Sequence, residues 1–125
     1  MSLTPVHLDT SFLIRALRPG TRQDQMLRAL LEASRELAMS SIAWAEFLCG
    51  PLNGRQLDIA RRITPELIPF TDKDAALTAE LFNESGRRRS SLTDCMIAAT
   101  ALRCNARLAT ANQADFKRLR VALVE

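Results

Sequence analysis

The sequence contains no tyrosine and few aromatic residues of any kind, with five phenylalanines and one tryptophan among 125 residues. Aromatic rings are the usual platforms on which the bases of a single-stranded nucleic acid stack. This scarcity argues against base stacking as a major binding interaction. Any contact with a nucleic acid would have to depend on other groups.

Histidine and cysteine are also scarce, with one histidine and three cysteines. Cys49, Cys95 and Cys104 form no CxxC pair, and His7 lies far from them along the chain. A structural zinc site needs four closely spaced sulfur or nitrogen ligands, so the sequence predicts no such site. We expect the cysteines to be small buried apolar residues and His7 to be an ordinary strand residue.

Long apolar runs are absent too, because no stretch approaches the roughly 20 residues that cross a bilayer. The N-terminus also lacks a basic segment followed by an apolar core and a cleavage site. The sequence therefore predicts a cytoplasmic protein without membrane contact. We assign no function to residues 1–3.

With 47% apolar and 25% charged residues, and no repeat or linker, residues 1–125 are expected to form one domain.

The net charge of +3 is small, but the basic residues are grouped. Arg87, Arg88 and Arg89 are consecutive, and smaller basic groups occur at residues 61–62 and 117–120. Such groups either contact the phosphates of a polyanion or form ordinary solvated surface. The charge pattern permits a nucleic-acid partner without demonstrating one.

Short apolar runs bounded by turn residues alternate with helical patterns along the chain. Strands are predicted at residues 6–8, 37–40, 67–71, 107–110 and 121–124, and helices at 10–17, 21–35, 42–49, 72–85, 92–104 and 112–118, with another short helix after Asn53. Pro69 lacks an amide proton, which places the third strand at a sheet edge. The nearly apolar segment 92–104 predicts a central, buried helix. This alternation predicts an α/β fold with a mostly parallel five-stranded sheet covered on both faces.

Two acidic residues are predicted near the ends of the first two strands. Asp9 directly follows the first strand, and by itself it could equally cap the next helix. Glu46 lies in the helix after the second strand, where its neighbours at helical spacing are apolar or small. Glu46 is therefore expected on a buried face, where a carboxylate must be neutralised, paired with an arginine or bound to a metal.

Two more acidic residues lie in the second half of the chain. Asp94 occupies the first turn of the apolar helix and shares a face with Ile97 and Ala98, although it could simply compensate the helix dipole. Asp115 follows the fourth strand by a few residues, and by itself it could belong to a turn. Neither residue is decisive alone.

Taken together, the four acids are expected to meet, because the carboxyl ends of parallel strands share one edge of a sheet, where ligands bind. Their mutual repulsion would destabilise the fold or force protonation unless a cation offsets it. With no histidine or cysteine ligand, such a site prefers magnesium or manganese over zinc. A cation of this kind supports the hydrolysis of phosphodiester bonds by water.

Four short motifs contain these acids: LDTS at residues 8–11, SIAWAEF at 41–47, LTDCMIAA at 92–99 and LATANQADF at 108–116. They resemble motifs of the PIN-domain family, in particular the VapC toxins of bacterial toxin–antitoxin pairs. No single motif is specific, but the ordered set resembles the family over essentially the whole chain.

The resemblance implies a three-layer α/β/α sandwich around a parallel sheet. It also implies an endoribonuclease that hydrolyses RNA with Mg2+ or Mn2+ and is inhibited by a cognate small antitoxin protein, and we expect a homodimer. Asp9, Glu46 and Asp94 match the three most regular acids of the family and are thus expected to be catalytic residues and metal ligands.

The fourth acid of the family stands at the position of either Asn112 or Asp115. Asn112 can act as a ligand or hydrogen-bond but carries no charge, so we favour Asp115 as the fourth catalytic and metal-binding residue and treat Asn112 as a supporting one. Ser11 and Thr110 match the small hydroxyl residues that support such sites. The run Arg87–Arg89 is a candidate contact for RNA.

Other functional classes fit the sequence less well. Haloacid-dehalogenase-like phosphatases need a second aspartate two residues after the first, where this chain has Ser11. Neither the aspartate nor the lysine that a receiver domain needs at the ends of later strands is evident. The remaining alternative is a catalytically inactive PIN-like binding module, whose acids hold only the fold or a partner; the presence of all three regular acids favours the enzyme.

Overall fold

The computed structural model describes residues 3–64 and 66–125, so the assignment made for residues 1 and 2 lies outside it. The strands are β1 (Val6–Leu8), β2 (Leu37–Ser40), β3 (Leu67–Ile68) and β4 (Arg107–Ala109). The helices are α1 (Thr10–Ala16), α2 (Arg22–Glu32), α3 (Ser41–Leu48), α4 (Gly54–Ile63), α5 (Asp72–Glu84), the 3₁₀ turn η1 (Arg89–Ser91), α6 (Leu92–Arg103) and α7 (Gln113–Phe116). In this part of the chain no helix is long and apolar enough to span a membrane.

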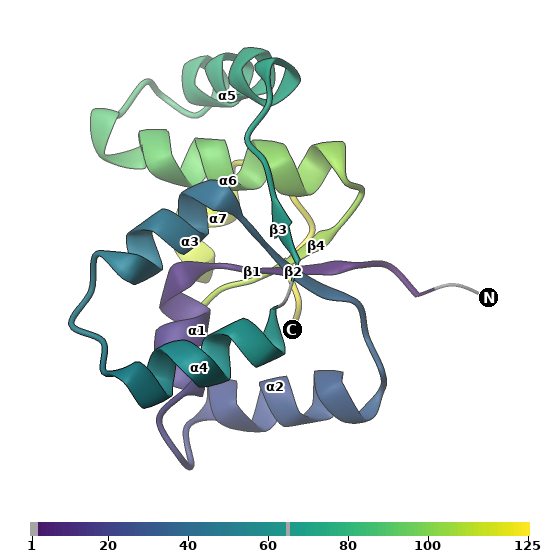
Figure 1. Cartoon of the computed structure of the whole chain (residues 1–125). Helices are drawn as coiled ribbons and strands as arrows, with labels where there is room; N and C mark the ends of the chain where they lie inside the picture. Colours follow the sequence, from purple (N-terminus) through teal and green to yellow (C-terminus); the bar gives the residue numbers. More distant parts are fainter. Residues whose placement is uncertain (1–2, 65) are drawn as a thin grey trace.

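The sheet is parallel, and its strands lie in the order β3-β2-β1-β4. Figure 1 shows the sheet between two helical layers, with α5 and α6 on one side and α1, α2 and α4 on the other. The predicted α/β fold with helices on both faces is confirmed. The third strand lies at the edge, as Pro69 predicts, and it ends at Ile68, one residue before that proline.

The prediction of a fifth strand at residues 121–124 is wrong. Within the described residues the sheet has four strands, and this segment forms only an isolated bridge between Leu123 and Leu108. The reason lies just before it: Arg120 adopts a left-handed backbone conformation (φ 62°), and the Val121 amide bonds back to the Leu119 carbonyl at 2.7 Å. The chain therefore turns as it reaches β4 and pairs with it only briefly.

Side-chain caps define several helix starts. The Thr21 side chain accepts a hydrogen bond from the Asp24 amide at the start of α2, as the sequence predicts. At α3, which the sequence predicts to start at residue 42 and thus after Ser41, the cap is one residue earlier, at Ser40, whose hydroxyl accepts from the Ala43 amide at 3.1 Å. The Ser41 hydroxyl instead accepts from the amide of Phe70 and so ties α3 to the segment after β3.

Helix α6 is the central buried helix that its composition predicts, and its residues 95 and 97–101 are all buried.

Among the cysteines, Cys95 is fully buried, Cys104 is half-buried and Cys49 is exposed. The expectation of burial is therefore wrong for Cys49, which stands at the end of α3 where the helix leaves the core. His7 is a buried strand residue, and burial above all lowers its pKa to about 4, so it is neutral at pH 7.

A buried ion pair joins α5 to α6. The side chain of Asp74 is fully buried, and its Oδ1 lies 2.5 Å from Nε of Arg103. Its other oxygen accepts hydrogen bonds from the Thr100 hydroxyl at 2.9 Å and the Thr71 amide at 3.1 Å. Burial alone would raise the pKa of Asp74, but the hydrogen bonds from Arg103, Thr71 and Thr100 outweigh it, so the pKa lies below its ordinary value.

This ion pair predicts a large and specific loss of stability. Arg103→Ala would leave the Asp74 carboxylate buried without its cation, so the free energy of unfolding should fall by about 3 kcal/mol. Arg28→Ala is the matched control, because Arg28 pairs with Asp24 on an exposed helix surface and should contribute only about 0.5 kcal/mol. Urea unfolding measures both changes, and equal losses in the two variants would contradict the buried pair's role.

Candidate active site

The carboxyl ends of β1 and β4 define the place where a ligand is expected in this fold. The chain runs from β1 to β2 and β3 on one side of the sheet, and β4 pairs with β1 on the other side. Ligands bind in the crevice at such a switch in strand order. Asp9 directly follows β1 and Thr110 directly follows β4, so both lie at this crevice.

Asp9 is held by two hydroxyl groups. Its side chain is buried, and Oδ2 accepts hydrogen bonds from Ser11 Oγ at 2.7 Å and from Thr110 Oγ1 at 2.8 Å. Asp9 occupies the N-cap position of α1, but its side chain makes no capping hydrogen bond to the helix. The alternative that Asp9 acts as a helix cap is therefore wrong, and its carboxylate is instead fixed toward the crevice.

Glu46 lies on the rim of the crevice. The expectation that it is on a buried face is wrong, because the residue is exposed, whereas Ala43 and Phe47 form the buried face of α3. Its carboxylate contacts the protein at Thr10, where Oε1 accepts from the hydroxyl at 3.2 Å. Desolvation of the carboxylate, followed by the charge of Asp9, raises the pKa of Glu46, partly offset by the Thr10 bond.

The Asp94 carboxylate is the electrostatic centre of the site. The residue is half-buried in the first turn of α6. Its pKa is raised to about 7, first by burial and then by the charges of Asp9, Asp115 and Glu46. A helix N-terminus favours the ionised form of a carboxyl group, so dipole compensation does not set the state of this residue. The charges of the other three sequence-predicted acids therefore all reach Asp94.

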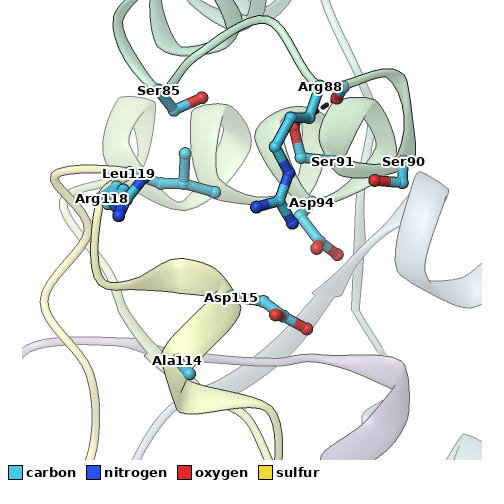
Figure 2. Close-up of a pocket in the computed structure, with 9 residues that line it drawn as sticks. All are labelled: Ser85, Arg88, Ser90, Ser91, Asp94, Ala114, Asp115, Arg118 and Leu119. Carbon is cyan, nitrogen blue, oxygen red and sulfur yellow. Dashed lines mark hydrogen bonds between the residues drawn. The ribbon is translucent and has the colours of Figure 1, made fainter.

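Asp115 and Asn112 differ in their position relative to Asp94. Asp115 lies in the first turn of α7 and lines a pocket of about 440 Å³ together with Asp94, as Figure 2 shows. Asn112 precedes α7, is exposed and does not line this pocket. Its backbone N–H donates to the Thr110 hydroxyl at 3.0 Å, which supports the residue that holds Asp9.

The arginine run Arg87–Arg89 does not act as a unit. All three residues are exposed, but only Arg88 lines the pocket of Asp94 and Asp115. Arg118 lines the same pocket, and sequence reasoning named it only as part of a basic group. A signal was present in the helix predicted at 112–118, where Arg118 would lie one turn after Asp115, although α7 ends at Phe116 in the structure.

The donor set fits a hard divalent cation by its chemistry. Among residues 3–64 and 66–125, no three histidine, cysteine, aspartate or glutamate side chains form a ready-made metal-ligand group. The candidate ligands are nevertheless all oxygen donors, namely four carboxylates and the hydroxyls beside them, which suits magnesium or manganese. Glu46 and Asp115 are exposed, so their side chains are free to adjust around an ion.

Comparisons with solved structures find this fold in toxin–antitoxin proteins. VapBC2 from Rickettsia felis bound to a promoter DNA fragment is 27% identical, with 96% of each chain covered and a TM-score of 0.75. A toxin–antitoxin complex from Klebsiella pneumoniae is 27% identical over 95% of this chain and 96% of that one, with a TM-score of 0.73. FitAcB from Neisseria gonorrhoeae shares the fold at 24% identity, 96% coverage of each chain and a TM-score of 0.74.

Comparisons of the sequence give two results. No curated protein matches the chain significantly. The family model of the PIN domain matches residues 6–122, which include all four acids, the two hydroxyl residues that hold Asp9 and both arginines of the pocket. Since this match spans nearly the entire sequence, the chain belongs to the PIN-domain family.

Proposed function

We propose that this chain is a magnesium- or manganese-dependent endoribonuclease and the toxin of a VapBC-type toxin–antitoxin pair. One observation carries the proposal: four carboxylates from four separate segments converge at the carboxyl ends of β1 and β4, with no cation of the protein paired to them in the described residues. Membership of the PIN-domain family, whose members are generally nucleases, supports this assignment.

Asp74 shows how this chain treats an acid whose role is structural. Asp74 is buried, paired with Arg103 and bonded to two further donors. The acids of the site have no comparable partners, and repulsion from the others helps to raise the pKa of Asp94 to about 7. This contrast favours a cation-binding enzyme over the alternative, an inactive PIN-like binding module whose acids only hold the fold.

The proposed roles follow from how firmly each acid is held. Asp9, Glu46, Asp94 and Asp115 would hold the cation, which when bound supplies Lewis acidity to the phosphodiester and to the attacking water. Asp9 is the fixed member, because Ser11 and Thr110 orient its carboxylate. The exposed Glu46 and Asp115 flank the opening of the site, where they can accept a proton from an approaching water molecule.

The proposed inhibitor is a small antitoxin that docks on the layer formed by α1, α2 and α4. These helices line a largely apolar groove of about 630 Å³, which also includes polar residues such as Arg28 and Arg55 and in which Leu31 and Ile59 remain exposed. The similar structures from Rickettsia felis and Klebsiella pneumoniae are toxin–antitoxin assemblies, which supports a partner of this kind. A basic side chain of the partner could then occupy the place of the cation among the acids.

We also propose that the toxin is a homodimer and acts in the cytoplasm.

The cation site predicts an order of catalytic losses. Asp94→Asn should reduce manganese-dependent cleavage of RNA by about 100-fold or more, since even residues that only orient metal ligands contribute roughly 10–100-fold. Asp115→Asn should cost more activity than Asn112→Ala, because only Asp115 adds negative charge. Asp58→Asn, an exposed position on α4, is the control and should cleave normally. Normal cleavage by folded Asp94→Asn would exclude this site, and the reverse ranking would move the fourth ligand to Asn112.

The raised pKa of Asp94 predicts a pH-dependent stability difference in the cation-free protein. Between its ordinary 3.8 and about 7 the folded state binds more protons than the unfolded state, so this residue lowers stability as pH rises. The stability gained by Asp94→Asn over the unmodified chain should therefore be larger at about pH 8 than at about pH 5, measured by urea unfolding in EDTA. Comparison at each pH cancels other groups such as His7, whose lowered pKa acts in the opposite direction. An equal gain at both pH values would argue against repulsion at Asp94.

The proposed partner predicts growth phenotypes. Expression of the chain alone should arrest growth, co-expression of the adjacent small gene should restore it, and the Asp94→Asn chain should be harmless. Leu31→Asp should prevent rescue and co-purification while RNA cleavage persists, because a charge would disrupt the apolar groove; Leu48→Asp, exposed outside the groove, is the control. If the chain purifies from healthy cells, cleaves no RNA with manganese and binds no product of a neighbouring gene, the inactive module takes precedence.

A further inference from the structure

The pocket beside the acids has both negative and positive walls. It is lined by Ser85, Arg88, Ser90, Ser91, Asp94, Ala114, Asp115, Arg118 and Leu119. In the view of Figure 2, Arg88 reaches from its loop toward Asp94 and Asp115, and Arg118 lies beside Leu119 at the other end. The two arginines come from opposite sides of the pocket, one from the loop after α5 and one from the segment after α7.

The backbone after α5 selects Arg88 from the arginine run. Gly86 and Arg87 both adopt left-handed conformations (φ 105° and 60°), so the chain reverses direction directly after the helix. The Arg87 side chain turns back and donates to Asn83 Oδ1 at 2.7 Å. The Arg88 carbonyl accepts hydrogen bonds from both the amide and the hydroxyl of Ser91, at 2.9 and 2.7 Å. Arg88 thus leaves a fixed backbone and faces the pocket.

Ion pairing separates Arg118 from its basic neighbours. Arg120 is bound to Glu84, with Glu80 4.0 Å away, and so it is tied to the outer surface of α5. Lys117 is exposed and does not line the pocket. Within the described ranges neither Arg118 nor Arg88 has a carboxylate within 4.0 Å, so both guanidinium groups keep their hydrogen-bond donors available.

We propose that Arg88 and Arg118 form a phosphate subsite, which binds the RNA backbone next to the phosphodiester that is hydrolysed at the acids. This inference rests on the proposed ribonuclease function and defines how its substrate is held. A planar guanidinium group binds two phosphate oxygens at once. The subsite also answers an electrostatic problem, since four carboxylates repel a polyanion and nearby cations offset this repulsion.

The composition of the pocket specifies recognition of the backbone rather than of the bases. None of its lining residues is aromatic, so bases have no ring on which to stack there. Its polar groups are guanidinium, hydroxyl and carboxylate groups, and contacts of guanidinium groups with phosphates carry no sequence information. The subsite should therefore strengthen binding of different RNA sequences to the same extent.

The test measures binding of a labelled single-stranded RNA to the full chain by fluorescence anisotropy, in the non-cleaving Asp94→Asn background. Arg88→Ala and Arg118→Ala should each raise Kd about tenfold, equivalent to about 1.4 kcal/mol. Each should also reduce the slope of log K against log salt by roughly 0.7. Arg89→Ala and Lys117→Ala carry the same charge change outside the pocket and should alter Kd less than about twofold.

A second readout separates positioning from chemistry. With Asp94 intact, Arg88→Ala and Arg118→Ala should raise KM for RNA more than they lower kcat, because the subsite acts on bound substrate and transition state alike. Arg88→Lys should restore part of the affinity, since it keeps the charge but loses the two-pronged geometry. Two RNAs of unrelated sequence should lose affinity equally.

The possible failures are distinguishable. If the unmodified chain cleaves RNA but the pocket variants bind like the reference, the subsite is overturned and the ribonuclease proposal stands. Equally large losses of RNA affinity in Arg89→Ala and Lys117→Ala would indicate attraction by the overall positive charge and would also overturn the subsite. Sequence-dependent losses would overturn backbone recognition. A chain that neither binds nor cleaves RNA would overturn both proposals, whereas binding without cleavage, with the expected arginine losses, would overturn only hydrolysis.

Discussion

Repulsion between carboxylates at the carboxyl edge of the sheet is the constraint that this structure has to accommodate. The chain does so differently for each acid. Hydroxyl donors stabilise the charge of Asp9, and a weaker hydroxyl contact reaches Glu46. Asp115 stays exposed to water, and Asp94 has a pKa near neutrality, so it can keep a proton. In the described residues none of the four acids forms an ion pair with an arginine, so the carboxylates remain available to an external cation.

Helix α6 connects the acids at this edge of the sheet to the buried ion pair of Asp74 and Arg103. Asp94 lies in its first turn, while Thr100 and Arg103 in its last turns hold the buried carboxylate of Asp74. Between these ends the helix is almost completely buried. The ion pair to α5 and the apolar contacts of α6 therefore fix the position of Asp94. These interactions offset the unfavourable free energy of holding Asp94 near other charges.

The parts of the fold that could be predicted from the sequence are those set by local pattern. The apolar period of residues 92–104 and the short apolar runs before Asp9 and Ser41 identified the core helix and the parallel strands. What could not be predicted depends on contacts between distant residues. The left-handed turn at Arg120 prevents the predicted fifth strand from forming. Asp74 pairs with an arginine 29 residues away, a partner that no local spacing reveals.

The same distinction applies to the site. The approach of the acids to one edge could be predicted because parallel strands share that edge. The exposure of Glu46 could not be predicted, because it depends on how α3 packs against the rest of the fold. Helical spacing correctly placed Ala43 in the core, but Glu46 falls at the boundary of that buried face. The sequence also did not distinguish the three residues of the arginine run. In the structure the turn at Gly86 and Arg87 places only Arg88 in the pocket.

The positions of the two cavities constrain how inhibition would have to work. The pocket of the acids lies among α6, α7 and the loop after α5, whereas the apolar groove lies among α1, α2 and α4 in the other helical layer. A partner that filled only the groove would leave Asp94 and Asp115 accessible to RNA. An effective inhibitor must therefore extend past the carboxyl edge of the sheet, where repulsion between the acids favours a basic side chain. Apolar burial would provide affinity at one end of such a segment, and charge would block the site at the other.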